Sequence, residues 1–380
     1  MKRFTRLFKL LIIMALLYAF VFLPIPFYLE IPGKAFGLDQ MVEVDNKFSE
    51  GPGDFYLTTV SIQQATPLTA FSSVLPFRDL VSEADLFGDI DDFDEYDAMQ
   101  QYYMNSSINT AIQVAFEAAD ADYELQYNGV YVLQVLEEST FSDQLKIGDT
   151  VKKTDGIEFK SSNEFIDYIA NKEVGERVTI EIDRDGESIT ASGELILLES
   201  GLPGIGIGLA DNTSIETNPD VTIHSGAIGG PSAGLMFSLQ IYKQLTGENI
   251  HGSNDIAGTG TIAPDGAVGR IGGIAKKVVA SDEQGIDYFF APEDEINAEM
   301  KAVYPELKSN YEEAVDAAEA INSKMEIIPV KNISDALAFL DSLNREAAVL
   351  QFKPTAPINV WDDLNVASSN FFSKMIQMSV

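Results

Sequence analysis

The sequence predicts an α+β protein of several domains that follows an N-terminal apolar helix. An uncharged segment of 20 residues lies between Lys9 and Glu30, near the start of the 380-residue chain. From Tyr123, about 75 residues alternate short strand-like runs with turn dipeptides, and a later stretch of about 145 residues alternates strand-like and helix-like patterns. The length suits two or three domains with hydrophobic cores of their own.

Charge and cysteine content exclude several functions. The chain carries 25 Lys and Arg against 59 Asp and Glu, which gives a formal net charge of −34. Nucleic-acid phosphates repel such a chain, so we expect no nucleic-acid partner. The chain has no cysteine, which excludes disulfides, thiol nucleophiles and cysteine-bound zinc. We expect neither a metal nor another cofactor.

The uncharged segment LLIIMALLYAFVFLPIPFYL predicts a membrane anchor. Four basic residues, Lys2, Arg3, Arg6 and Lys9, precede it, and the first acidic residue, Glu30, follows it. As a helix its 20 residues span about 30 Å, the thickness of a bilayer core. Basic residues at this end place the N-terminus in the cytoplasm. We therefore expect residues 1–29 to form a cytoplasmic basic flank and an uncleaved single-pass transmembrane anchor in the cell membrane, with the rest of the chain extracellular. A cleaved signal peptide is the alternative.

Residues 30–122 are expected to form an extracytoplasmic N-terminal region. The run TTVSIQQATPLTAF alternates in the manner of strands, and MNSSINTAIQVAFEAAD has the start signals and apolar spacing of a helix. Between them, residues 82–97 carry many carboxylates with interleaved aromatic residues. This acidic segment lacks the spacing of a calcium loop, so we interpret it as solvated rather than metal-binding.

The β-rich stretch, residues 123–200, resembles a PDZ domain of the bacterial protease type. Turn dipeptides at Asp155-Gly156 and Asp185-Gly186 separate its apolar runs. The resemblance rests on NGVYVLQVLEESTFSDQLKIGDTVKKTDGIEF, and above all on the phrase from Leu145 to Gly156. It implies that an extended peptide adds to a strand edge. The implied groove runs along Gly129, Val130, Tyr131 and Val132, opposite a helix at residues 164–170.

The stretch GAIGGPSAGLMF allows three interpretations of Ser232: a helix cap, part of a phosphate loop, or a nucleophile. A phosphate loop needs a Lys after its last Gly, which is absent here, and Pro231 has no N–H. The two histidines, His224 and His251, lack the context of a Ser-His-Asp triad. A nucleophilic Ser232 would therefore need a lysine base, whose pKa burial would lower.

Helical periodicity does not show which of two lysines would act as the base. In GRIGGIAKKVVAS the apolar residues form one helical arc, and Lys276 and Lys277 flank this arc from opposite sides.

The segments GGPSAG and TGTIAPDGAVGRIGGIAKKVVAS together resemble the proteolytic domain of Lon-type Ser–Lys proteases. This resemblance covers residues 201–345 and leaves residues 346–380 as a C-terminal tail. It implies that Ser232 is the nucleophile, that Lys277 is the general base and that Thr259 orients Lys277. Backbone N–H groups from Gly230 to Ser232 would hold the oxyanion, with Gly230 and Pro231 as supporting residues of this loop.

The order of anchor, PDZ module and Lon-type domain resembles the membrane-anchored PDZ-domain Lon-like proteases of Gram-positive bacteria, a group with a streptococcal pheromone-processing member. The resemblance implies an ATP-independent serine endopeptidase that cleaves extracytoplasmic peptides or unfolded segments, including a secreted signalling peptide, and it leaves a homo-oligomer open. The alternative is a catalytically inactive, membrane-tethered PDZ scaffold that binds peptides. Labelling of Ser232 by a serine-reactive probe separates the two hypotheses.

Overall fold

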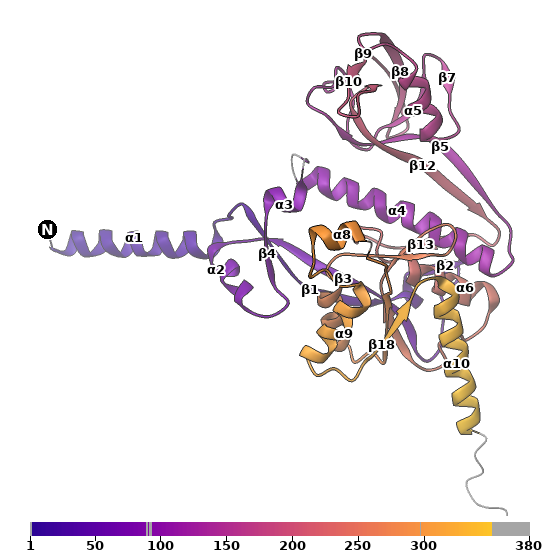
Figure 1. Ribbon diagram of the computed structural model, residues 1–380. Coiled ribbons are helices and arrows are strands. Elements are labelled where there is room, and N and C mark those ends of the chain that lie inside the picture. Colours follow the sequence, from indigo (N-terminus) through magenta and orange to yellow (C-terminus); the bar gives the residue numbers. More distant parts are fainter. Residues whose placement is uncertain (1, 89, 91–92, 297, 352–380) are drawn as a thin grey trace, which may run out of the picture.

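The computed structural model describes residues 2–88, 90, 93–296 and 298–351, and the chain folds into two bodies (Figure 1). We call residues 23–122 and 218–351 the main domain and residues 123–217 the insert domain. The chain leaves the main domain after helix α4 (Phe93–Ala118) and returns to it through strand β12 (Ile207–Thr217). The insert domain is therefore an insertion within the main domain.

A six-stranded mixed sheet forms the centre of the main domain. Its strand order is β18-β17-β14-β3-β1-β4. The bounds are β1 (Phe27–Gly37), β3 (Asp54–Gln64), β4 (Asp79–Ser82), β14 (Asp255–Gly258), β17 (Tyr288–Pro292) and β18 (Glu326–Val330). Strand β3 and the three C-terminal strands run parallel, whereas β1 is antiparallel to both β3 and β4. Residues near both ends of the sequence therefore build one sheet.

Helices cover both faces of this sheet. Adjacent strand residues point to opposite faces, so Phe289 and Phe290, both fully buried, belong to two different cores. The core around Phe290 includes side chains of α4, α6 (Gly234–Thr246) and α10 (Ile333–Gln351). The core around Phe289 includes side chains of α7 (Ile274–Asp282) and α9 (Asn310–Ala320). Burial on both faces explains the continuous apolar run YFFAP in β17.

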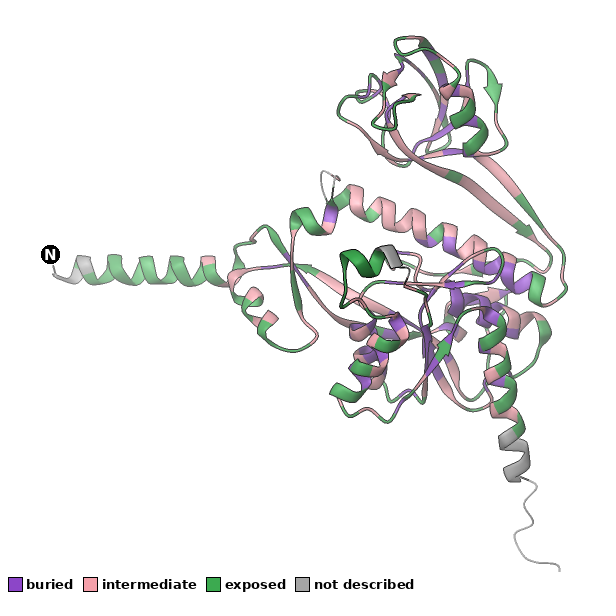
Figure 2. Ribbon diagram, in the orientation of Figure 1, coloured by how far each residue is buried: buried purple, intermediate pink, exposed green. Residues whose placement is uncertain are grey.

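The N-terminal helix α1 (Lys2–Phe22) projects from the main domain and is exposed along most of its length (Figure 2). Within the part of the chain that the structure describes, no helix combines the length and apolar character needed to cross a membrane. The transmembrane prediction for residues 1–29 is thus not supported. The longest uncharged run within α1 is residues 10–22, and these 13 residues span about 20 Å against the ~30 Å of a bilayer core.

The insert domain is a small β-rich module. Its strand order is β12-β5-β6-β8-β9, with β7 paired to β6. The bounds are β5 (Tyr123–Val135), β6 (Thr150–Thr154), β7 (Ile157–Glu158), α5 (Ser162–Ala170), β8 (Arg177–Arg184), β9 (Glu187–Glu194), β10 (Ile196–Leu197) and β11 (Pro203–Gly204). Thirteen buried apolar residues, among them Phe141 and Phe165, form a core that is separate from those of the main domain. Strands β5 and β12 extend beyond this core as a two-stranded ribbon (Figure 1).

The mixed α/β character and the β-rich module are as predicted, but the domain boundaries differ. Residues 30–122 were expected to form a region of their own, yet β1 and β3 lie in the sheet with β14. Strand-like runs predict strands but not which sheet they join. The remaining short elements are η1 (Leu38–Gln40), β2 (Val42–Val44), α2 (Pro67–Ala70), η2 (Phe71–Val74), α3 (Glu83–Phe87), β13 (Val221–Ile223), β15 (Thr261–Ile262), β16 (Val268–Gly269) and α8 (Ala298–Val303).

The acidic segment, residues 82–97, is more ordered than a solvated run. It contains α3 and the first turn of α4, although residues 89, 91 and 92 lie outside the described residues. Its aromatic residues Phe87 and Phe93 pack against Tyr28 of β1. Helix α4 therefore begins at Phe93, eleven residues before the Met104 at which the predicted helical run starts. Of the predicted tail, residues 346–351 lie in α10 and residues 352–380 lie outside the described part.

Candidate active site

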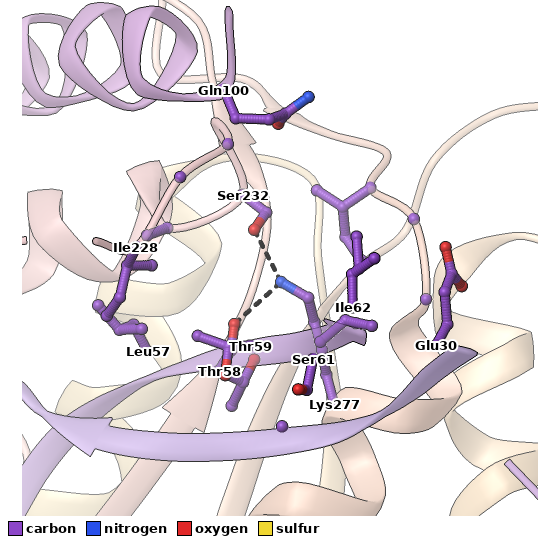
Figure 3. Close-up of a pocket in the computed structure, with 18 of the residues that line it drawn as sticks. Glu30, Leu57, Thr58, Thr59, Ser61, Ile62, Gln100, Ile228, Ser232 and Lys277 are labelled. Carbon is purple, nitrogen blue, oxygen red and sulfur yellow. Dashed lines mark hydrogen bonds between the residues drawn. The ribbon is translucent and has the colours of Figure 1, made fainter. Parts of the chain in front are cut away.

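Three of the predicted residues meet at one point of the main domain. Ser232 lies just before α6, Thr259 follows β14, and Lys277 lies on α7. Figure 3 shows the side chains of Ser232 and Lys277 pointing toward each other. The Nζ atom of Lys277 is 2.7 Å from the Oγ atom of Ser232 and 3.0 Å from the Oγ1 atom of Thr259. It also donates a hydrogen bond to the carbonyl oxygen of Thr58, at 3.0 Å. A serine hydroxyl and a lysine amine at this distance can exchange a proton directly.

Burial prepares Lys277 to act as a base. Its side chain is 3% exposed, and desolvation lowers the pKa of its ammonium group from 10.5 to about 7. All three acceptors of its hydrogen bonds are uncharged, so no anion holds the proton in place. Near neutral pH a large fraction of Lys277 is therefore the neutral amine that can accept the proton of Ser232.

Lys276, the other lysine that periodicity allowed, is placed differently. Its Nζ atom lies 3.0 Å from Oε2 of Glu30 and 2.5 Å from Oδ2 of Asp79. Burial lowers the pKa of Lys276, but the two carboxylates raise it by more, and the net pKa is above its ordinary value. Lys276 is thus a cation whose ion pairs connect α7 to β1 and β4. A protonated amine of this kind cannot accept the proton of Ser232.

Thr259 connects the two reacting groups. Its hydroxyl donates to the carbonyl oxygen of Ser232 at 3.0 Å, and it accepts a hydrogen bond from Lys277. The N–H group of Gly260 donates to the same carbonyl at 2.9 Å. These contacts fix the backbone of Ser232 relative to the amine, and the hydrogen bond from Lys277 is compatible with the predicted role of Thr259 in orienting that lysine.

We call residues 227–233 the nucleophile loop. Gly230 has a φ angle of +86°, which favours glycine, and its N–H group donates to the carbonyl oxygen of Gln100 on α4 at 2.8 Å. Pro231 has no N–H, and its carbonyl accepts a hydrogen bond from Ser107 of α4 at 3.0 Å. Among the described contacts, the N–H group of Ser232 has no partner. Of the backbone predicted to bind the oxyanion, Ser232 supplies the available donor.

Ser232 does not cap helix α6. The N-cap position is Ala233, and no side-chain hydrogen bond caps this helix end. The hydroxyl of Ser232 is bonded to Lys277 instead. Helix α6 ends at Thr246, and its C-cap Gly247 has the left-handed conformation.

The Ser232–Lys277 pair lies in a cleft of about 1080 Å³. Strands β1 and β3 form one side, the nucleophile loop forms the other, and Tyr96, Gln100 and Met104 of α4 contribute a wall. Neither histidine lines this cleft. His224 pairs with Glu43 at 3.1 Å, and buried His251 has a pKa lowered by desolvation to about 4. Tyr96 and Gln100 lie before the predicted helical run, which starts at Met104, so the sequence pattern did not indicate them.

The predicted peptide groove of the insert domain is misplaced. Gly129, Val130, Tyr131 and Val132 lie on β5, which is paired with β12 on one side and β6 on the other. Both edges of this strand are therefore occupied, and no peptide can add to it. Strands β12 and β9 are the outer strands of this sheet, and α5 contacts β12. We call the outer edge of β12, beside α5, the edge groove.

Two protein-family models match the chain. Residues 110–195 match the PDZ domain, and residues 207–340 match the Lon protease (S16) C-terminal proteolytic domain. The chain contains a Lon-type serine peptidase domain. In the structure this domain also includes β1 and β3, which lie before the matched residues and contribute Thr58 to the active site.

Individual relatives match parts of the chain. The chain is similar to the Lon protease of Aster yellows witches'-broom phytoplasma, with 28% identity over 35% of this chain and 15% of the relative. It is 34% identical to the Lon protease of Rickettsia bellii over 31% of this chain and 14% of the relative. The chain thus spans about a seventh of the length of these curated relatives. The PDZ domain of an SdrC-like protein from Listeria monocytogenes is 43% identical, with a TM-score of 0.21, over 22% of this chain and 88% of that structure.

Proposed function

We propose that this protein is an ATP-independent serine endopeptidase with a Ser232–Lys277 dyad. The observation that carries the proposal is the distance of 2.7 Å between a serine hydroxyl and a buried lysine whose pKa is about 7. The chain has no phosphate-loop motif, which supports independence from ATP.

The mechanism follows from the geometry of the dyad. The Oγ atom of Ser232 attacks the scissile carbonyl while its proton passes to the Nζ atom of Lys277. The N–H group of Ser232 donates to the oxyanion that forms. Lys277 then gives its proton to the leaving amine, which breaks the peptide bond and leaves an acyl-Ser232. A water molecule, deprotonated by Lys277, hydrolyses this ester and regenerates the serine.

The cleft fits an extended polypeptide rather than a folded protein. It runs between two strands and a loop, with a helix as a wall, so a chain must be extended to bring a carbonyl to Ser232. We propose peptides or unfolded segments as substrates, among them a secreted signalling peptide. The edge groove between β12 and α5 would recruit them by strand addition.

We also propose that α1 attaches the protein to the cell membrane and that the peptidase domain is extracellular. Large apolar side chains of α1 such as Leu7, Ile13 and Leu17 are more than half exposed, and basic residues precede its uncharged part. Membrane fractionation, with protease treatment of intact cells, tests this location. A chain found entirely in the soluble fraction would contradict it.

The activity is tested by incubating the purified full-length chain with unfolded casein in the absence of nucleotide. We expect cleavage that Ser232→Ala and Lys277→Ala abolish and that ATP does not increase. Lys276→Met serves as the matched control, because it removes the neighbouring amine and should leave cleavage measurable. Full cleavage by both dyad variants would refute the mechanism.

A further inference from the structure

Helix α4 holds the nucleophile loop. The carbonyl oxygen of Gln100 accepts the N–H of Gly230 at 2.8 Å, and the hydroxyl of Ser107 donates to the carbonyl of Pro231 at 3.0 Å. A Cβ atom on Gly229 would lie 2.8 Å from the Cβ atom of Gln100, so loop and helix are in close contact. Because packed interiors transmit displacement, a shift of this helix shifts the residues that precede Ser232.

The insert domain rests on another face of the same helix. The hydroxyl of Tyr102 donates to the carbonyl oxygen of Asp211 at 2.7 Å, and its ring stacks on Tyr131 with centroids 4.1 Å apart. One further contact follows two turns later, where Asn109 donates to the carbonyl of Thr213 at 2.8 Å. At 100° per residue, Tyr102 lies about 200° around the helix from Gln100. The ribbon and the nucleophile loop therefore contact α4 on nearly opposite sides.

Asp211 extends this connection into the edge groove. It lies on β12, the strand that forms one side of the groove. Its Oδ1 atom accepts the N–H group of Ser162 at 2.7 Å and the hydroxyl of Ser162 at 2.5 Å. Ser162 begins α5, the helix on the other side of the groove. One residue thus binds both sides of the groove together and also accepts the hydrogen bond from Tyr102.

We infer that α4 couples the PDZ domain to the nucleophile loop, with Tyr102 and Ser107 as positioning residues for Ser232. A peptide that enters between β12 and α5 displaces Asp211 through its hydrogen bonds to Ser162. The hydrogen bond from Tyr102 to Asp211 then transmits this displacement to α4. The rate of acylation then depends on the state of the edge groove. This inference rests on the proposed peptidase activity.

The test is a double-mutant cycle on casein cleavage by the full-length chain. We expect Ser107→Ala to lower kcat about fivefold and Tyr102→Phe to lower it about threefold, with KM changed less than twofold. Because both act through α4, the double variant should lose little more than Ser107→Ala alone. Ser107→Thr, which keeps the hydroxyl, should restore most of kcat. If kcat of the double variant fell about fifteenfold, the product of the two single losses, the inference would be overturned. An unchanged kcat in Tyr102→Phe would also overturn it.

Two further variants separate this outcome from general damage. Tyr168→Phe removes the same kind of hydroxyl, which bonds to Asp155 within the PDZ domain, and should leave kcat unchanged. Tyr131→Leu removes the stacking partner of Tyr102 from the PDZ side and should lower kcat as Tyr102→Phe does. If the wild-type chain itself fails to cleave casein, the proposed function fails instead. Cleavage by the wild type with no effect of Tyr102→Phe or Tyr131→Leu refutes the coupling alone.

Discussion

Replacing Lys277 by Met should abolish cleavage and change how the stability of the protein depends on pH. The folded state lowers the pKa of this amine from 10.5 to about 7 through burial. At about 1.4 kcal/mol per pKa unit, keeping the lysine buried costs about 5 kcal/mol relative to the unfolded chain. Met has a similar length and no charge, so it removes this cost. It also leaves three hydrogen-bonding oxygens without a donor, which costs about 1 kcal/mol each.

The sign of the pH effect follows from proton counts. Between pH 7 and pH 10.5 the unfolded lysine keeps its proton while the folded one has lost it. The unfolded state therefore binds more protons, and the stability of the wild type rises with pH in this window. At pH 7 the Met variant should be more stable than the wild type by about 1–2 kcal/mol. The stability difference between variant and wild type should fall by about 3 kcal/mol between pH 7 and pH 9.5.

Urea unfolding of both proteins at the two pH values, followed by circular dichroism, measures this difference. Lys276→Met is the matched control, because Lys276 is a paired cation and its removal should give no such gain at pH 7. A stability difference between Lys277→Met and wild type that stays the same at both pH values would refute the claim that Lys277 is neutral in the folded state.

Three further substitutions follow from the contacts. Thr259→Val removes the hydrogen bonds to Lys277 and to the carbonyl of Ser232, so kcat on casein should fall about tenfold; an unchanged kcat would exclude Thr259 from positioning. Gly230→Ala places a Cβ atom on a left-handed backbone, at φ +86° beside Gln100, and the resulting strain should lower kcat by a similar factor. Gly226→Ala is the control, because Gly226 has φ +59° but lies in open space, and kcat should not change. Equal effects of the two variants would count against a role for the contact between the nucleophile loop and α4. Arg184→Met leaves the 1%-exposed carboxylate of Asp149 without its ion pair and should destabilise the PDZ domain by about 3 kcal/mol, which a lower melting temperature would show. Arg177→Met, at an exposed position, is the control. Equal melting temperatures of the two variants would contradict a stabilising role for the Arg184–Asp149 ion pair.

The sequence predicted the chemistry of the site better than its surroundings. Ser232 and Lys277 lie in short motifs, in a turn before a helix and on a helix, and the resemblance of these motifs to Lon-type proteases named both residues. Periodicity alone left Lys276 and Lys277 open, because only tertiary structure shows that Glu30 and Asp79 pair with Lys276. Thr58 was missed because it contacts Lys277 only through its backbone carbonyl, from a strand 219 residues away in the sequence.

Strand pairing accounts for the misplaced groove and boundaries. The run that contains Gly129 predicts a strand, and β5 is one, but its neighbours on both sides come from distant residues. Whether a strand lies at a sheet edge depends on those long-range pairings, which a local pattern does not contain. The nested PDZ domain is a further consequence, since β3, which pairs with β1, also pairs with β14 across the whole insertion.

The most direct test of the dyad is the rate at which a fluorophosphonate probe labels the full-length chain as a function of pH, with the adduct located by peptide mass spectrometry. We expect one adduct on Ser232, a rate that rises with pH through about 7 as Lys277 loses its proton, and loss of labelling in Lys277→Met but not in Lys276→Met. Labelling of another residue, or a Ser232 rate that Lys277→Met leaves unchanged, would contradict the account.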